Sequence, residues 1–185
     1  MMPARDSWKP LSLESLGELP THQSINISHL DLFQESASLH RALGKVKTTP
    51  EILRDEGFRK DATFGCLVAE VPPEQRSKEG DTIVGYQFHY LTYCTWYGHV
   101  LFGEDLYVLP DFRGKGIGFS LLAKAAKIAL EKDCSQFRFI SARWNQPATD
   151  FYTKLGAVNV TVRDHWNLCS IEKEHIQRMA EQTRK

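Results

Sequence analysis

The chain has 185 residues, and its 23 lysine and arginine residues equal its 23 aspartate and glutamate residues in number. A chain of this length forms one domain with a single well-buried core, and its balanced charge creates no global field that would recruit nucleic acid or an anionic membrane. Nowhere do about eighteen apolar residues run together, and residues 1–10 contain no apolar segment, so we expect neither a membrane span nor a signal peptide. A cytoplasmic protein is the resulting expectation.

The N-terminal residues 1–21 are expected to form a poorly ordered arm, because they combine three prolines with scattered serines. Within this arm the segment 16–20 would make only a poor strand, since Pro20 has no N–H to donate to a ladder. The folded domain is therefore expected over residues 22–185.

Two helices are predicted at the start of this domain. The first covers 28–44 and carries its apolar stripe at Leu30, Phe33 and Ala37. The second is short: Thr49 supplies the N-cap, Pro50 the first helical residue and Gly57 the end.

Three strands follow at about 63–71, 82–93 and 99–109, and the short connections between them indicate an antiparallel meander. A helix is predicted over 117–132, and a further strand over 136–142. The apolar face of that helix consists of Ile117, Leu121, Ala125 and Ile128. Because a strand, a helix and a parallel strand in succession need a crossover, the sheet is expected to be mixed.

The C-terminal part is predicted to hold a short helix over 147–155, a strand near 166–171 and a terminal helix over 172–183. With the preceding elements, these give a domain of the α+β class.

The pattern Arg113-x-x-Gly116-x-Gly118 follows the third strand of the meander and opens the long helix. Glycines remove side chains where a ligand must approach the backbone, and the first amides of a helix are unpaired at the positive end of its dipole. The stretch lacks the Gly-Lys-Ser/Thr end of a Walker A loop and the third glycine spacing of a dinucleotide fingerprint. It therefore predicts either a pyrophosphate cradle or a strand-to-helix turn that uses glycines for packing.

A second block, residues 142–156, places Asn145 before a short helix, Pro147 in its first turn, Tyr152 inside it and Gly156 at its end. Together the two blocks resemble the GNAT family of acetyl-CoA-dependent N-acetyltransferases, most closely the diamine acetyltransferases, which are the spermidine/spermine enzymes and their thialysine-acetylating relatives. The resemblance covers roughly residues 50–182. The segments that carry it are 65–72, 83–85, 90–96, 104–105, 113–118, 144–145, 151–152 and 171–180.

The resemblance implies the GNAT fold, in which a mixed central sheet is flanked by helices and a glycine-rich turn binds coenzyme A. It implies that the pyrophosphate is bound by Arg113, Gly114, Lys115, Gly116, Ile117, Gly118 and Phe119. The main chain of Leu106, Tyr107 and Val108 would hold the pantetheine arm as an added strand, whatever the identity of their side chains. Asn145 would bind the coenzyme, and Phe119 replaces a serine that is frequent in the family.

The resemblance also implies the catalytic residues. Tyr152 would be the general acid toward the coenzyme A sulfur, because a phenol with a pKa near 10 is protonated at neutral pH; the alternative is that its ring packs in the core. Glu104 would receive the proton of the amine. Asp105, Trp96, Asp164 and His40 would border the acceptor. Asp105 points to the opposite sheet face by simple alternation unless a bulge re-aims it, and it could equally be a solvated acid at a strand end.

The acceptor groove departs from the family pattern. His40 stands where the family has a glutamate, Cys94 where the spermidine/spermine branch has an aspartate, and three cations follow at Arg41, Lys45 and Lys47. Like charges repel, so efficient turnover of a long polyamine is not expected.

We expect an enzyme that transfers acetyl from acetyl-CoA to a primary amine of a small diamine, polyamine or thialysine-like acceptor by direct attack. Two alternatives stay open: a protein lysine or N-terminal acetyltransferase, and a non-catalytic acetyl-CoA-binding module. The family resemblance implies a homodimer.

No metal is expected, since the seven histidines show no His-x-x-x-His pairing. The four cysteines, at 66, 94, 134 and 169, are widely spaced without Cys-x-x-Cys, which indicates reduced thiols.

Overall fold

A computed structural model describes residues 16–18, 27–57 and 62–182. These residues form two compact units, one that extends to Ile140 and one that begins at Ser141. Every helix in the described ranges is too short or too polar to cross a lipid bilayer.

The first unit is built on a five-stranded sheet whose strands follow one another in chain order. The strands are β1 (Leu16–Glu18), β2 (Gly65–Glu70), β3 (Ile83–Cys94), β4 (Gly98–Val108) and β5 (Gln136–Phe139). Neighbouring strands are antiparallel from β1 to β4, and β5 runs parallel to β4. The predicted meander and mixed sheet are therefore confirmed, although β5 ends at Phe139 and not at residue 142.

The first strand is present but short. β1 pairs with β2 over three residues and ends two positions before Pro20, as the missing ladder donor of a proline requires. The rest of the predicted N-terminal arm, residues 1–15 and 19–21, lies outside the described residues.

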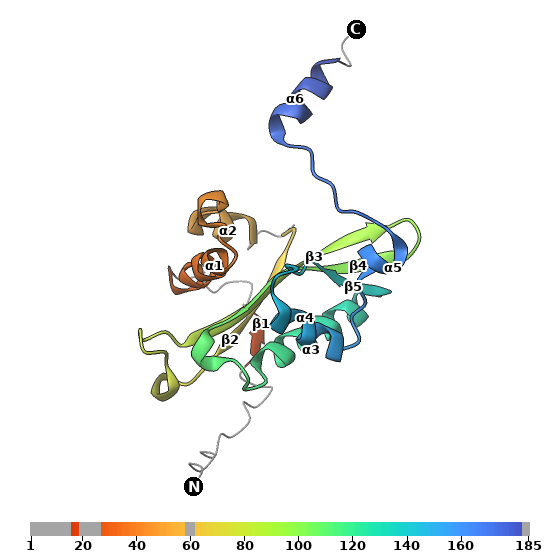
Figure 1. The fold of residues 1–185 in the computed structure, drawn as a ribbon. Helices are drawn as coiled ribbons and strands as arrows, with labels where there is room; N and C mark the ends of the chain where they lie inside the picture. Colours follow the sequence, from red (N-terminus) through yellow and green to blue (C-terminus); the bar gives the residue numbers. More distant parts are fainter. Residues whose placement is uncertain (1–15, 19–26, 58–61, 183–185) are drawn as a thin grey trace. The chain divides into compact units, whose positions relative to one another are not determined.

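Helices cover both faces of this sheet. The helices α1 (Ile27–Leu39) and α2 (Pro50–Gly57) lie against one face, and α3 (Ile117–Glu131) lies against the other (Figure 1). Short 3₁₀ turns occur at Leu43–Lys45, Pro73–Gln75 and Pro110–Phe112. The predicted cap of α2 is confirmed, because the Thr49 hydroxyl accepts a hydrogen bond from the Ile52 amide at 3.3 Å.

Helix α1 ends at Leu39, five residues before the predicted end at residue 44. Arg41 adopts a left-handed conformation with φ 53°. This lets the amides of Arg41 and Ala42 donate to the carbonyls of Ser38 and Ala37 at 2.9 and 2.7 Å, which closes the helix in a Schellman motif. Gly44, the predicted stop, lies in the following 3₁₀ turn.

The core lies on both sides of the sheet. On α3, Ile117, Leu121 and Ala125 are buried as predicted, while Ile128 is only half-buried. On α1 the buried positions are Leu32 and Ser36. They differ from the predicted stripe: Phe33 and Ala37 are half-buried, and the side chain of Leu30 lies outside the description.

The second unit contains α4 (Gln146–Lys154), α5 (Val160–Asp164) and α6 (Lys173–Gln182). The strand predicted near 166–171 was wrong, because these residues are irregular and exposed. A strand needs a neighbouring strand to pair its backbone groups, and the described part of this unit contains none.

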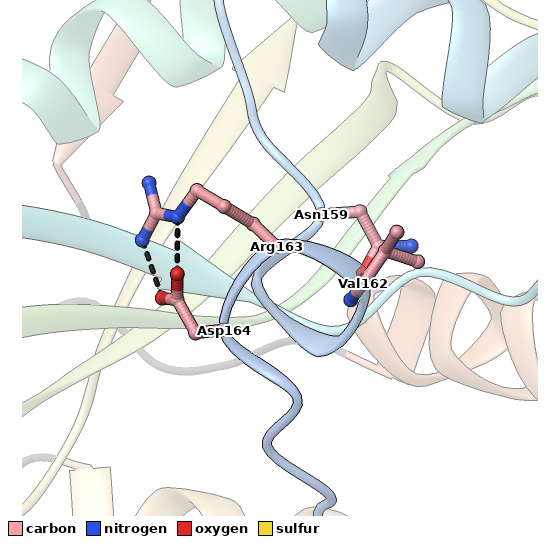
Figure 2. A network of polar contacts seen from close by, with 4 residues as sticks. All are labelled: Asn159, Val162, Arg163 and Asp164. Carbon is pink, nitrogen blue, oxygen red and sulfur yellow. Dashed lines mark hydrogen bonds and ion pairs between the residues drawn. The ribbon is translucent and has the colours of Figure 1, made fainter.

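Helix α5 was not predicted. It begins where the Asn159 side chain accepts a hydrogen bond from the Val162 amide at 3.3 Å (Figure 2). It ends at Asp164, and the following residue, His165, has φ 59°.

Candidate active site

A bulge in β4 sets the direction of its two adjacent acids. Phe88 pairs with Asp105 while the next residue, His89, pairs with Gly103, so Glu104 is an extra residue without a cross-strand partner. Tyr86, Phe88 and Tyr90 alternate onto the face of β3 that α1 covers. Both acids contact this set: Asp105 accepts a hydrogen bond from Tyr86, and Glu104 accepts one from Tyr90 at 3.4 Å. The bulge therefore places both carboxylates on the α1 face, contrary to simple alternation.

Asp105 is held in a polar cluster between α1 and the sheet. The Ser36 hydroxyl lies 2.9 Å from one of its carboxylate oxygens and 3.2 Å from the other. Ser36 and Tyr86 are both 2% exposed. Burial and the nearby Asp105 carboxylate raise the pKa of Tyr86 and also raise that of the neighbouring Cys66 thiol to about 12, so both groups keep their protons. Asp105 is thus not the solvated acid that the sequence allowed.

Within the described part of the first unit, one edge of β4 has no paired strand beside these acids. Its parallel ladder with β5 covers Val100–Gly103 and Gln136–Phe139. The Leu109 amide donates to the Val84 carbonyl at 2.9 Å. In an antiparallel pair the residues alternate, so Leu106 and Val108 direct their backbone groups away from β3, toward the side on which the β5 ladder has ended. That edge suits an extended arm with amide groups, which could bind there as an added strand.

The side chain of Tyr107 has a structural role, although the family resemblance implies only a main-chain role for this residue. Its hydroxyl donates to Glu35 of α1 at 3.0 Å, and its ring is buried. Burial, with the Glu35 carboxylate, raises its pKa to about 12. Tyr107 therefore ties β4 to α1.

The glycine-rich turn after β4 has the geometry of an anion site. Gly114 and Gly116 have φ of 73° and 84°, and a Cβ added at either would meet no atom within 4 Å. The glycines are therefore required by the backbone conformation and not by packing. Gly116 is the N-cap of α3, a helix of 15 residues, whose first amides and dipole favour an anion. The turn fits a pyrophosphate.

The side chains of this turn add positive charge and exposed surface. The Arg113 Nε donates to the Val108 carbonyl at 2.8 Å, and its guanidinium lies 5.4 Å from the centre of the Tyr107 ring. Lys115 Nζ lies 4.8 Å from the centre of the Phe112 ring. Phe119, the third residue of α3, is exposed.

The predicted acceptor residues of the first unit lie on separate elements. His40 follows α1, and Trp96 lies in the turn between β3 and β4; both are exposed. Nearby, Cys94 accepts a long hydrogen bond from Arg138 at 3.7 Å. The backbone amides of Trp96 and Tyr97 and the Arg138 guanidinium lower the pKa of this thiol.

In the second unit, Asn145 is the N-cap of α4, and its side-chain oxygen accepts from the Ala148 amide at 3.4 Å. Tyr152 and Phe151 are both half-buried on this helix, with ring centres 5.3 Å apart. The Asp164 carboxylate forms a two-pronged ion pair with the adjacent Arg163, at 2.5 and 2.6 Å (Figure 2). The charge of Asp164 is therefore already matched by a cation.

Sequence reasoning did not find the residues that hold the acids of β4, which are Ser36, Tyr86 and Tyr90. The alternation of Tyr86, Phe88 and Tyr90 along one strand was a usable signal for a shared face. Ser36 carried no such signal, because its partner Asp105 is 69 positions away.

Comparison with known proteins agrees with this geometry. A sequence model of the acetyltransferase (GNAT) family matches residues 31–157, which is more than half of the chain. The chain is 39% identical over 151 residues to a thialysine N-epsilon-acetyltransferase of Sus scrofa, with 82% of this chain and 89% of the relative covered. It is 34% identical to the human spermidine/spermine N(1)-acetyltransferase-like protein 1, over 82% of this chain and 22% of that protein.

Solved structures share the fold. An integron cassette protein from V. cholerae superimposes with a TM-score of 0.66 at 18% identity, over 89% of this chain and 96% of that one. The chain therefore belongs to the GNAT acetyltransferase family, whose members use acetyl-CoA as the acyl donor, and it is an N-acetyltransferase.

Proposed function

We propose that the protein transfers the acetyl group of acetyl-CoA directly to a primary amine of a small thialysine-like or short diamine acceptor. The observation that carries the proposal is the composition of β4 and the turn after it: within 15 residues they supply an exposed carboxylate, an open strand edge and a left-handed glycine turn at a helix start. The extensive match to thialysine N-epsilon-acetyltransferases supports the choice of acceptor class.

Acetyl-CoA, when bound, supplies an acetyl group activated as a thioester. The turn from Arg113 to Phe119 would hold its pyrophosphate, and Asn145 would add a polar contact to the coenzyme, as the family resemblance implies. The backbone of Leu106 and Val108 would pair with the pantetheine amides. Val108 can serve in this way while Arg113 donates to it, because a carbonyl oxygen has two lone pairs.

Glu104 would take the proton of the amine. An alkylamine with a pKa near 10.4 is neutral in only roughly one molecule in 2,500 at pH 7, so a base beside it raises the reactive fraction. Glu104 is exposed and accepts a single long hydrogen bond from Tyr90 within its unit, which leaves room for an ammonium group. Tyr152 Oη would donate its proton to the departing thiolate.

A covalent route through a cysteine has little support. Burial holds the pKa of Cys66 at about 12, and Cys94 is paired with an arginine and not with a histidine base.

The cations after α1 support a preference among acceptors. If His40, Arg41, Lys45 and Lys47 border the acceptor, an amine with a neighbouring carboxylate gains a partner there, while a polyamine meets repulsion that grows with its charge. The order of kcat/KM is then thialysine-like amines and short diamines first, spermidine second and spermine last, with a gap that narrows as salt rises. We also propose a cytoplasmic homodimer, as in the family that the chain resembles, with a folded domain that comprises β1 in addition to residues 22–185.

The test measures acetylation of free amines and of lysine peptides by the wild-type protein and three variants. Tyr152→Phe and Glu104→Gln should each lower kcat/KM by roughly 10²-fold while calorimetric affinity for coenzyme A stays within about twofold of wild type. His40→Glu should raise spermidine use selectively. A Tyr152→Phe protein with full activity would show that Tyr152 is not the general acid. A preference for peptides over free amines would show that the acceptor is a protein and not a small amine.

A further inference from the structure

The two adjacent acids of β4 lie on one face but in different surroundings. Asp105 is half-buried and accepts hydrogen bonds from two buried hydroxyls, those of Ser36 and Tyr86. Glu104 is exposed and accepts one bond of 3.4 Å from Tyr90. Two carboxylates in such different surroundings are not equally available to a cation.

The Asp105 cluster joins three elements at one point. Ser36 comes from α1, Tyr86 from β3 and Asp105 from the bulged part of β4. Hydrogen bonds to an ionised carboxylate are stronger than neutral ones, and without it the hydroxyls of two buried residues would each lose a hydrogen bond. The carboxylate therefore fixes α1 and the bulge together, and Glu104 is the residue that this bulge displaces.

A second hydrogen bond also connects α1 to β4. Glu35, next to Ser36 on α1, accepts from Tyr107, two residues beyond Asp105 on β4. Glu104 takes part in neither of these connections. Its only anchor within the described part of the first unit is Tyr90, whose ring stacks on Phe102 with centres 5.2 Å apart. A stacked ring holds its hydroxyl in one place, and a long bond orients a carboxylate without occupying it.

The surroundings of Tyr90 also suit a cation. Burial and the Glu104 carboxylate raise the pKa of Tyr90, so its hydroxyl stays protonated and remains a donor. The Tyr90 hydroxyl lies 3.4 Å from the Glu104 carboxylate, and aromatic rings attract ammonium groups.

We propose a division of roles: Asp105 is a positioning residue that binds no acceptor and fixes the bulge through Ser36 and Tyr86, whereas the acceptor amine meets Glu104, which Tyr90 orients. This inference rests on the proposed function, because it assigns residues for amine acetylation. It changes the role of Asp105, which the family resemblance assigns to acceptor binding.

The experiment compares kcat and KM for one diamine and one monoamine in Asp105→Asn, Ser36→Ala, their double variant and Tyr90→Phe. If Asp105 is a positioning residue, Asp105→Asn and Ser36→Ala each lower kcat by about tenfold, and the kcat of the double variant is no lower than that of the less active single variant. KM for either amine then changes by less than about threefold. Tyr90→Phe should lower kcat/KM by about fivefold or more. Glu35→Gln weakens the hydrogen bond between Tyr107 and α1, so it controls for a general effect of loosening that helix.

The opposite outcome is equally measurable. If Asp105→Asn raises KM for the diamine by tenfold or more over the monoamine while Ser36→Ala does not, Asp105 binds the acceptor and the inference is wrong. It is also wrong if Tyr90→Phe has wild-type kinetics. Ser36→Ala removes one hydroxyl, so it tests the cluster even if Asp105→Asn does not fold. A wild-type protein that acetylates neither amine would instead refute the proposed function.

Discussion

Replacing Gly116 by alanine separates the backbone role of the glycine turn from its contribution to stability. Gly116 has φ +84°, and an L-residue in this region costs roughly 1–2 kcal/mol. An alanine also restricts the unfolded chain, which returns about 0.4–1 kcal/mol. Since a Cβ at this position would meet nothing within 4 Å, no steric cost is added. The net loss is about 1 kcal/mol, or roughly 2–4 °C in Tm for a chain of this size.

The effect on coenzyme binding should be larger than the effect on stability. Relief of the strained φ turns the amide at the start of α3 away from the phosphate. A hydrogen bond to a charged group contributes about 1.5–3 kcal/mol, so the loss of one weakens binding roughly 10- to 150-fold. Titration calorimetry with coenzyme A measures the affinity, and urea unfolding measures the stability.

Gly98→Ala is the matched control. Gly98 has φ +75° and equally open surroundings, but it is the first residue of β4, directly after the turn that follows β3. It should lose a similar amount of stability and retain wild-type affinity for coenzyme A. Equal affinities in the two variants would show that the turn before α3 holds no phosphate, and the reasoning from left-handed glycines would fail.

Three further outcomes are expected. Leu121→Ala should lose roughly 2–5 kcal/mol in urea unfolding, because Leu121 is 0% exposed; a loss below about 1 kcal/mol would mean that α3 is not docked on the sheet. Burial lowers the pKa of His89 below its ordinary value of 6.5, so the unfolded chain binds more protons than the folded one. The free energy of unfolding should therefore fall as the pH drops from 6.5 through the folded pKa. If the urea midpoint falls by the same amount between about pH 7.5 and pH 5 in the wild type and in His89→Gln, this expectation is wrong. A thiol reagent at pH 8 should label Cys94 well before Cys66, whose thiol is buried with a pKa of about 12. The Cys66→Ala variant identifies the signal of Cys66, and equal labelling rates of the two thiols would show that Cys66 is not buried.

Local patterns predicted most of the first unit. Turn residues and strand periodicity predicted the meander, and glycine spacing predicted the start of α3, because both depend on neighbours within a few positions. The end of α1 was missed because Arg41 adopts a left-handed conformation that is uncommon without glycine.

The candidate site was predicted less completely. The register of the bulge at Glu104 depends on the pairing with β3, and the fixation of Asp105 depends on a serine 69 positions away. The strand expected near 166–171 is absent for a related reason: a strand exists only where another strand pairs with it, and the described part of the second unit contains none.

The alternation of residues along β4 couples the binding of the acetyl donor to the binding of the acceptor. The even positions 106 and 108 offer their backbone at the open edge, while the odd positions 105 and 107 hold α1. A ligand that straightens or shifts this strand from its edge also moves the anchor points of the helix on its face. Thermodynamic linkage then requires the acceptor to alter donor affinity by the same factor. A library that randomises α1 to accept new amines should accordingly be screened at both limiting and saturating acetyl-CoA, since variants selected at one concentration will rank differently at the other.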